Sequence, residues 1–184
     1  VLGASVEPTW ADAPIARAAA FALTASCGGA LHLPILKEHY ADYEPRSRDR
    51  FVAGSLMPAA WLDRARRIRA LARDSLLELL RQYDVLIAPA TPLSAPRIDA
   101  ETIDINGTQM GKRPALGLLA QPMSFVGVPV VTVPVWLDGY AMPLGVQIIA
   151  APWREDVALS AAAIVQALMP EHVHAPVAHV ANPL

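Results

Sequence analysis

Few residues in this sequence have a type and a spacing that could support chemistry. His172 and His174, separated by one valine, could ligate a metal ion, but no acidic residue or cysteine stands at a suitable spacing. We therefore interpret them as part of a solvated tail. The lysines Lys37 and Lys112 lie among polar residues, where an amine keeps its proton and cannot act as a general base. Neither a metal site nor a catalytic lysine is predicted.

Motifs that hold nucleotides or serine nucleophiles are missing from the chain. There is no Gly-x-Gly-x-x-Gly and no phosphate-loop pattern, so nucleotide binding has no support. The Gly-x-Ser-x-Gly elbow of many serine hydrolases is also absent. The residues by themselves predict a folded core without a complete set of catalytic groups, and no cofactor.

The composition is typical of a folded protein in a reducing compartment. Of the 184 residues, 54% are hydrophobic and 17% are charged, which excludes a disordered linker. Lys+Arg 15 and Asp+Glu 17 give a net charge of -2, so the basic surface of a nucleic-acid-binding domain is not expected. The single cysteine, Cys27, cannot form an internal disulfide, and we expect a cytoplasmic protein.

Two long uncharged runs, 114–137 and 139–153, raise the question of a membrane span. The first run is long enough to cross a bilayer. However, it contains Pro122, Pro129 and Pro134, and each proline removes a helical hydrogen bond. We interpret both runs as buried core and expect no membrane partner.

Hydrophobic periodicity and capping residues predict four helices and three strands. The helices are expected at Ala11–Gly28, Arg46–Gly54, Pro58–Tyr83 and Arg154–Met169, and the strands at Asp84–Pro89, Val128–Trp136 and Leu144–Ala151. Gly28 and Gly29 are interpreted as the stop signal of the first helix. The strands are continuously apolar, which is typical of strands buried on both faces. Asn106–Gly107 predicts a tight turn within a surface excursion over 90–115.

Two of these helices have a predicted core face. On the third helix it comprises Trp61, Leu62, Ala65, Ile68, Ala72, Leu76, Leu79 and Leu80, and on the last helix Val157, Leu159, Ala163, Ile164 and Leu168. The opposite face of the third helix is charged. We interpret it as a solvated face with local ion pairs, such as Asp63 with Arg67.

Helices alternating with strands predict an α/β fold. No linker or repeat divides the chain, so we expect a single partial domain over residues 1–184. Three strands are too few for a sheet covered on both faces, and the sheet is expected to continue on chain that is not present. The start at Val1, without a methionine, also suggests a piece of a longer protein.

Three stretches, taken in order, resemble the C-terminal half of the amidase signature family. They are Arg50–Gly54 continued by Pro58–Trp61 and Asp84–Pro92, then Gln121–Pro129 continued to Pro134, and finally Met142–Ala150. These are similar to the family's arginine-to-glycine turn with its Asp-x-x-x-x-Pro-x-x-Pro strand exit, its Asn-x-x-Gly-x-Pro segment and its Leu-Pro-x-Gly-x-Gln strand. The resemblance implies the C-terminal portion of the amidase signature fold, a mixed β-sheet covered by helices.

The resemblance implies an amide hydrolase with a Ser, cis-Ser, Lys triad. In that chemistry a neutral lysine takes the nucleophile's proton through the middle serine, and backbone N–H groups stabilise the oxyanion. This chain has no adjacent serine pair, so no catalytic residue is assigned in it and the triad is expected upstream of Val1. The chain alone is expected to be inactive. The alternatives are a glutaminase like the A-subunit of glutamyl-tRNA(Gln) amidotransferase, and a binding or interaction module without catalysis.

One substrate-binding residue, Arg50, is implied by the resemblance. It stands where the branch formed by the A-subunit of glutamyl-tRNA(Gln) amidotransferase, which acts on glutamine, has an arginine for the substrate carboxylate, and arginine suits bidentate pairing. The alternative is an exposed arginine in the cluster of Arg46, Arg48 and Arg50. Gly117 stands where the same branch has an aspartate for the substrate's ammonium group, which argues against an amino-acid substrate. At Ser124 the family usually has asparagine.

The run from Arg48 to Ala59 is most similar to the carboxybiuret hydrolase branch of the family. The substrate of that branch is a carboxylated amide without an ammonium group. The resemblance therefore implies a small-molecule amide substrate and a small helical partner subunit. Uncovered apolar sheet surface in this chain would favour a homo-oligomer.

Overall fold

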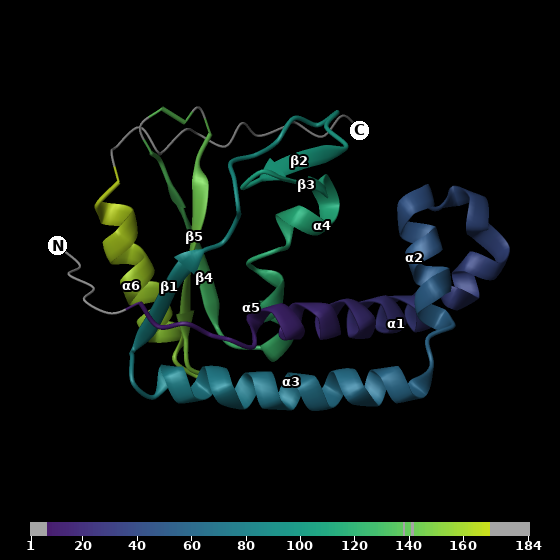
Figure 1. Ribbon diagram of the computed structural model, residues 1–184, viewed down its shortest axis with the longest axis horizontal. Helices are drawn as coiled ribbons and strands as arrows, with labels where there is room; N and C mark the ends of the chain where they lie inside the picture. The colour runs from purple at the N-terminus through teal and green to yellow at the C-terminus, as the bar shows by residue number, and fades with distance from the viewer. Residues whose placement is uncertain (1–6, 138, 141, 170–184) are drawn as a thin grey trace, which may run out of the picture. The chain divides into compact units, whose positions relative to one another are not determined.

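The computed structural model describes residues 7–137, 139–140 and 142–169 (Figure 1). The chain divides into two compact units. Unit 1 holds the chain up to Asp84 together with Gly117–Val128, and unit 2 holds Val85–Leu116 and the chain from Pro129. The single partial domain expected over residues 1–184 stays a prediction.

Unit 1 is helical. It consists of α1 (Ala13–His39), the 3-10 helix η1 (Tyr40–Asp42), α2 (Pro45–Ser55), α3 (Ala59–Leu80) and α5 (Gln121–Val126). α1 contacts α2, α3 and α5, and Figure 1 shows it lying alongside α3. The segment before α1 is fixed to α3 because Trp10 Nε1 donates to Ser75 Oγ at 2.9 Å and Ser75 Oγ donates to Asp12 Oδ2 at 2.6 Å. The predicted second and third helices are confirmed.

The prediction that α1 stops at Gly28 and Gly29 is wrong, because the helix continues to His39. The glycines serve a close helix contact instead. A Cβ atom on Gly29 would lie 2.5 Å from the Phe51 carbonyl oxygen of α2, and one on Gly54 would collide with the carbonyl of Ala25. α1 and α2 therefore touch backbone to backbone, and only glycine fits at the contact.

α1 also bears on the membrane question. Together with η1 it is long and apolar enough, by length and composition, to cross a membrane, although the two uncharged runs of the sequence lie elsewhere. A core helix of a folded protein passes the same test. Its buried positions are Ala16, Ala19, Ala20, Ala25, Gly29 and Leu36, and they face other helices of unit 1. The expected absence of a membrane partner stays a prediction.

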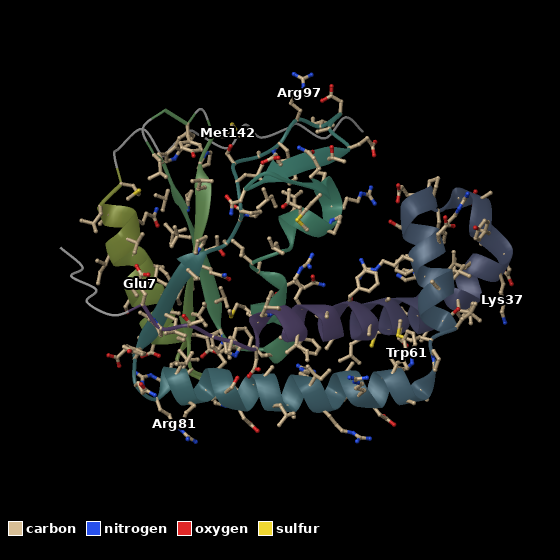
Figure 2. All side chains as sticks on the ribbon, in the orientation of Figure 1. Glu7, Lys37, Trp61, Arg81, Arg97 and Met142 are labelled. Atoms are coloured by element: carbon tan, nitrogen blue, oxygen red, sulfur yellow. The ribbon has the colours of Figure 1, made fainter. Side chains whose placement is uncertain are left out.

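The charged face of α3 is mostly solvated, as predicted, but the predicted ion pair and one predicted core position differ. Asp63 pairs with Arg66 at 3.1 Å rather than with Arg67, because both side chains reach each other across three residues. Trp61, expected in the core, is 64% exposed at the start of the helix (Figure 2). The buried positions of α3 are Ala65, Ala72, Leu76 and Leu80.

The short helix α5 was not predicted, since six residues are too few for a hydrophobic period to show. It ends at Gly127, whose φ of 70° lies in the left-handed region that favours glycine. Arg73 of α3 donates Nη1 to the carbonyls of Val126 and Gly127, the latter at 2.9 Å. Arg73 thus caps α5, and its interpretation as part of a merely solvated face is wrong.

Unit 2 contains an antiparallel sheet in the order β1 (Val85–Pro89), β5 (Leu144–Ala150), β4 (Val130–Val135). The helix α6 (Glu155–Ala167) contacts all three strands, which confirms the α/β class. β5 is buried along most of its length, but β1 and β4 are only partly buried, so burial on both faces was wrongly predicted for them. A mixed sheet needs a parallel pair, and no such pair forms among the described strands.

The helix α6 uses a different face from the predicted one. Ala158 and Ala162 are buried against the sheet, where small side chains let the helix approach closely. Leu159, Ile164 and Leu168, predicted to be in the core, are exposed by 58%, 56% and 62%. The hydrophobic periodicity correctly predicted a helix. It did not identify the buried face, because the helix has apolar residues on both faces.

The surface excursion over 90–115 contains a hairpin of β2 (Thr102–Ile105) and β3 (Thr108–Gly111), followed by α4 (Lys112–Leu116). Asn106 and Gly107 both have positive φ, 51° and 81°, as the predicted tight turn requires. The Asp104 carboxylate accepts a hydrogen bond from the Gly107 N–H at 2.9 Å and holds the turn.

Candidate substrate-binding site

Arg50 lies on the exposed side of α2 and reaches across to α1. Its Nη2 donates to the Thr24 hydroxyl at 2.9 Å, and its guanidinium carbon lies 5.0 Å from the centre of the Phe21 ring. Both partners are neutral. The Thr24 contact uses one of the five N–H donors of a guanidinium, so the geometry leaves donors available for a bidentate anion.

The carboxylate of Asp49, next to Arg50 in the sequence, contacts other residues. Asp49 accepts a hydrogen bond from the Tyr40 hydroxyl at 3.0 Å and lies 3.7 Å from Arg48 Nε. Arg48 also lies over the Tyr40 ring at 4.5 Å. Within the described part of the chain, Arg50 therefore has no ion-pair partner, which distinguishes it from Arg48 in the predicted arginine cluster.

An aromatic cluster supports the turn between α1 and α2. The His32 ring stacks on Phe51 at 4.3 Å between ring centres, and its Nδ1 lies 3.0 Å from the Tyr43 hydroxyl. Gly28 makes room for the Phe51 ring, because a Cβ there would lie 2.9 Å from it. This cluster fixes α2 on α1 and so positions Arg50.

The other two positions compared with the family are near α5: Gly117 lies before the helix and Ser124 lies within it. The Gly117 carbonyl accepts a hydrogen bond from Gln121 N at 3.0 Å, and the exposed Ser124 donates its backbone N–H to Ala120. In Figure 1, α5 and α2 lie towards opposite ends of α1. The hydrogen bond and the ring contact of Arg50 both go to α1, so the structure does not bring it together with Gly117.

All three family-like stretches contribute a strand to the sheet of unit 2, and a buried amide links two of them. Gln147, only 2% exposed in β5, donates Nε2 to the Pro89 carbonyl at the end of β1 at 3.0 Å. Beyond it, Ala90 N donates to the Gly145 carbonyl at 2.7 Å. Sequence reasoning missed this contact, although Gln147 carried a signal for it as the one polar side chain in an apolar run.

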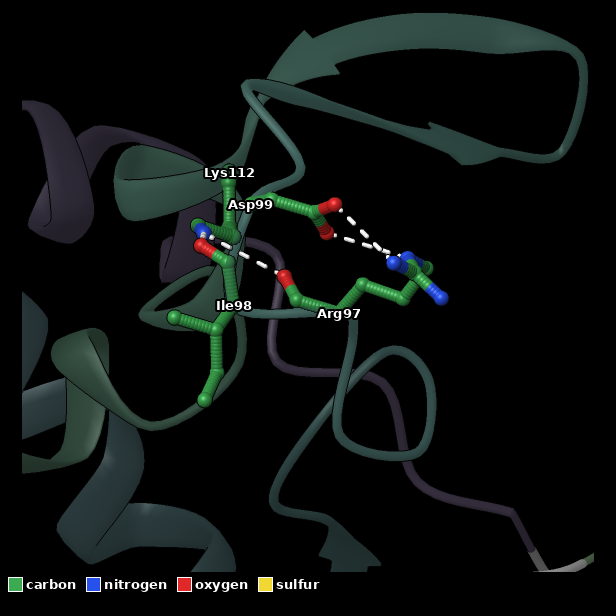
Figure 3. Close-up of polar contacts among 4 residues, drawn as sticks. All are labelled: Arg97, Ile98, Asp99 and Lys112. Atoms are coloured by element: carbon green, nitrogen blue, oxygen red, sulfur yellow. Dashed lines mark hydrogen bonds and ion pairs between the residues drawn. The ribbon is translucent and has the colours of Figure 1, made fainter.

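The lysines keep polar surroundings, as predicted. Lys112 Nζ donates to the carbonyls of Ile98 at 2.6 Å and Arg97 at 3.3 Å, while Lys37 is exposed on α1 (Figures 2 and 3). Asp99 accepts two hydrogen bonds from the Arg97 guanidinium, both at 3.0 Å (Figure 3). That guanidinium lowers the pKa of the Asp99 carboxyl and the carboxylate raises the pKa of Arg97. These are structural contacts of a surface loop.

In the ranges that the structure describes, no group of three or more metal-ligating side chains is found. His172 and His174 lie outside these ranges.

Comparison with known proteins shows the family to which the chain belongs. A family model described as Amidase matches residues 42–159, which include α2 to α5, all the strands and the start of α6. The chain belongs to the amidase family. The resemblance stated from the sequence is therefore confirmed.

Two relatives show how the chain compares with individual amidases. It is 54% identical over 166 residues to AtzE, a 1-carboxybiuret hydrolase subunit of Pseudomonas sp. (strain ADP), covering 90% of this chain and 36% of that protein. It is 32% identical to the A-subunit of glutamyl-tRNA(Gln) amidotransferase from Rhizorhabdus wittichii, covering 66% of this chain and 24% of that protein. The chain thus spans about a third or less of the length of these amidases.

Solved structures give the same relationship. One is a vestigial protein complex described as revealing the origins of an s-triazine catabolic enzyme, with a TM-score of 0.86 and 53% identity over 90% of this chain and 36% of that one. A crystal structure of an amidase has a TM-score of 0.72 and 29% identity over 77% of this chain and 32% of that one. Both confirm that these residues adopt part of the amidase fold.

Proposed function

We propose that the chain is the C-terminal part of an amide hydrolase that acts on a small carboxylated amide such as 1-carboxybiuret. The observation that carries this proposal is the 54% identity with the 1-carboxybiuret hydrolase subunit over 90% of the chain. Arg50 supports the substrate class, because its guanidinium rests on neutral groups and lacks a carboxylate in the described residues. The substrate would supply that carboxylate.

The proposed division of labour leaves the bond-breaking step to residues outside this chain. The chain has no adjacent serines, so the Ser, cis-Ser, Lys triad would lie upstream, and no cofactor is required. Arg50 would bind the carboxylate and orient the amide. The isolated chain should release no ammonia from 1-carboxybiuret above background, whereas the full-length enzyme should. Turnover by the isolated chain would contradict the proposal, and an inactive full-length protein would favour the binding module.

The substrate class is tested at Arg50 in the full-length enzyme. Removing a hydrogen bond to a charged group costs about 1.5 to 3 kcal/mol, or roughly 10- to 150-fold in binding. Arg50→Ala should raise KM for a carboxylated amide by that order with a smaller change in kcat, and Arg50→Lys should restore only part. Arg66→Ala on the surface of α3 is the control. Equal losses on a neutral aliphatic amide would make Arg50 structural.

A second candidate, a glutaminase like the A-subunit of the amidotransferase, is favoured by the 32% identity with that protein. Gly117 counts against it, because an aspartate for the substrate's ammonium is missing there. A Cβ on Gly117 would have nothing nearer than Gln121 at 3.9 Å, so an aspartate fits. Gly117→Asp in the full-length enzyme should increase glutamine hydrolysis if this region faces the substrate, and wild-type turnover of glutamine as the best substrate would overturn the first proposal.

The remaining proposals concern the partner subunit, the oligomeric state and the cellular compartment. We propose a small helical partner subunit, supported by the 54% identity with a protein that is itself one subunit of an enzyme and by a similar structure described as a complex. We also propose a cytoplasmic location, which the single cysteine, Cys27, supports. A homo-oligomer is supported by exposed apolar side chains such as Trp153 and Leu159. Both associations are tested by co-expressing the full-length protein with the products of neighbouring genes, purifying it and determining the mass of the complex. Cell fractionation tests the compartment.

A further inference from the structure

The hydrogen bond between Arg50 and Thr24 has a fixed direction. A threonine hydroxyl has one proton, and that of Thr24 is donated to the backbone of α1, where the Ala20 carbonyl lies at 2.9 Å and the Phe21 carbonyl at 3.3 Å. The oxygen lone pairs therefore face Arg50 Nη2, which donates to them at 2.9 Å. The helix backbone thus orients the hydroxyl, and the hydroxyl orients the arginine.

The Phe21 ring provides a second, independent restraint. The guanidinium lies 5.0 Å from the ring centre, within the range of a cation–π contact, although the ring is 56% exposed. Phe21 and Thr24 are three residues apart on α1 and share one face of the helix. One holds an edge of the guanidinium and the other lies against the group, which restricts a side chain that would otherwise rotate.

We propose that Thr24 and Phe21 are positioning residues that hold the Arg50 guanidinium ready for the substrate carboxylate and so set the preference for carboxylated amides. The inference rests on the proposed function of Arg50. Both residues orient the charge without neutralising it, because neither carries a charge of its own. Asp49 pairs with Arg48 and Tyr40 instead, so no carboxylate among the described residues competes with the substrate for Arg50.

Substitutions of Thr24 in the full-length enzyme test the role of charge directly. Thr24→Ser keeps the hydroxyl and should leave KM for a carboxylated amide unchanged. Thr24→Val keeps the shape but removes the acceptor, and should raise that KM roughly three- to tenfold. Thr24→Asp should pair with Arg50 and raise KM as far as Arg50→Ala does, whereas the neutral Thr24→Asn should not.

Two measurements on the Thr24 variants and two further variants separate positioning from a general structural effect. KM for a neutral aliphatic amide and the thermal midpoint should stay at the wild-type values in all four Thr24 variants. Thr108→Val, which removes an exposed hydroxyl from β3, should change nothing. Phe21→Leu provides an independent variant at an exposed position, and should raise KM for the carboxylated amide about two- to fivefold.

The outcomes also distinguish this inference from the proposed function. If Arg50→Ala raises KM selectively but Thr24→Val, Thr24→Asp and Phe21→Leu do not, the positioning role is wrong and the proposed function stands. If Arg50→Ala itself shows no selectivity, the proposed substrate class fails first. Equal loss of both substrates in the Thr24 variants would mean a structural role in α1 and would overturn the inference.

Discussion

Units 1 and 2 are packed by different kinds of residue. In unit 1, α1 and α2 meet through Gly29, Gly54 and Ala25, where backbone touches backbone and no side chain fits between. In unit 2, valine and isoleucine side chains build a sheet whose middle strand β5 is buried, while β1 and β4 form its edges. In the helix contact of unit 1, the two backbones cover each other. In the sheet of unit 2, the outer edges of β1 and β4 have no strand partner among the described residues.

Because the two units pack differently, we expect them to tolerate substitutions at different places. A backbone contact has no flexible atom that can move aside, so any added atom separates the helices and displaces Arg50 with them. A sheet edge and an apolar helix face can accept a further surface, because their atoms are already exposed to solvent. We therefore expect unit 1 to be sensitive to single methyl groups, and unit 2 to be sensitive mainly in the polar contact at Gln147.

The largest expected effect is that of Gly54→Ala. Its Cβ would collide with the Ala25 carbonyl, and overpacking that shifts the backbone costs about 1 to 3 kcal/mol, with the upper end expected where no flexible side chain can move aside. Urea unfolding should show this loss, and hydrogen exchange should accelerate in α1 and α2 but not in β5. Gly117→Ala is the matched control, since a Cβ there meets nothing closer than 3.9 Å. Equal stability of both variants would show that the helices separate easily.

The glycines also show what sequence reasoning can and cannot do. A Gly-Gly pair after an alanine-rich stretch is a helix stop by local rules, yet Gly28 and Gly29 lie inside α1 because a helix distant in sequence packs on them. The strands, the hairpin turn and three of the four predicted helices lie within a few residues of their predicted positions, because they depend on local patterns. The buried face of α6 does not, since its alanines are weak hydrophobic signals.

The second expected effect is in unit 2, at Gln147. Gln147→Leu keeps the volume but removes the donor to the Pro89 carbonyl, and leaving a buried acceptor unpaired costs about 1 to 3 kcal/mol. Hydrogen exchange should accelerate in β1 and β5. Gln109→Leu removes an exposed contact to Asp104 and serves as the control, with little effect expected. An unchanged Gln147→Leu variant would mean that the buried amide does not hold the two family-like stretches together.

The site was less predictable than the fold. The family resemblance selected Arg50 from three arginines, but nothing in the sequence around it indicates Thr24 or Phe21, which stand more than 25 residues earlier. Only the packing of α2 on α1 brings them to the guanidinium. Gln147 could have been identified as a lone polar residue in an apolar strand, and its partner Pro89 could not.

A smaller effect is expected for self-association through unit 2. Leu159 and Ile164 of α6 are 58% and 56% exposed, so covering them would contribute about 1 kcal/mol each. Leu159→Ser with Ile164→Ser should lower the weight-average mass of the chain in sedimentation equilibrium at high concentration. Ile98→Ser, an isolated apolar side chain on a loop, is the control. A wild-type chain that is strictly monomeric would contradict the expectation.

The smallest expected effect concerns the surface pair of Arg97 and Asp99. The guanidinium lowers the pKa of the Asp99 carboxyl below its unfolded value, so the pair stabilises unit 2 at pH values above that unfolded pKa. This contribution is lost as the pH falls through the folded pKa. The pKa of Arg97 is raised instead, and its contribution is lost only as the pH rises through that value, at strongly alkaline pH.

Both side chains are exposed, so solvent and salt screen the pair and its contribution should be close to the limit of measurement. Asp99→Asn should therefore barely change the thermal midpoint at neutral pH, and should make its decline in acid slightly less steep. High salt should remove the remaining difference from the wild type. A clear loss of stability at neutral pH that survives high salt would mean that Asp99 holds the loop near Lys112 by shape rather than by charge, and unit 2 would then depend on its hairpin side as well as on its sheet.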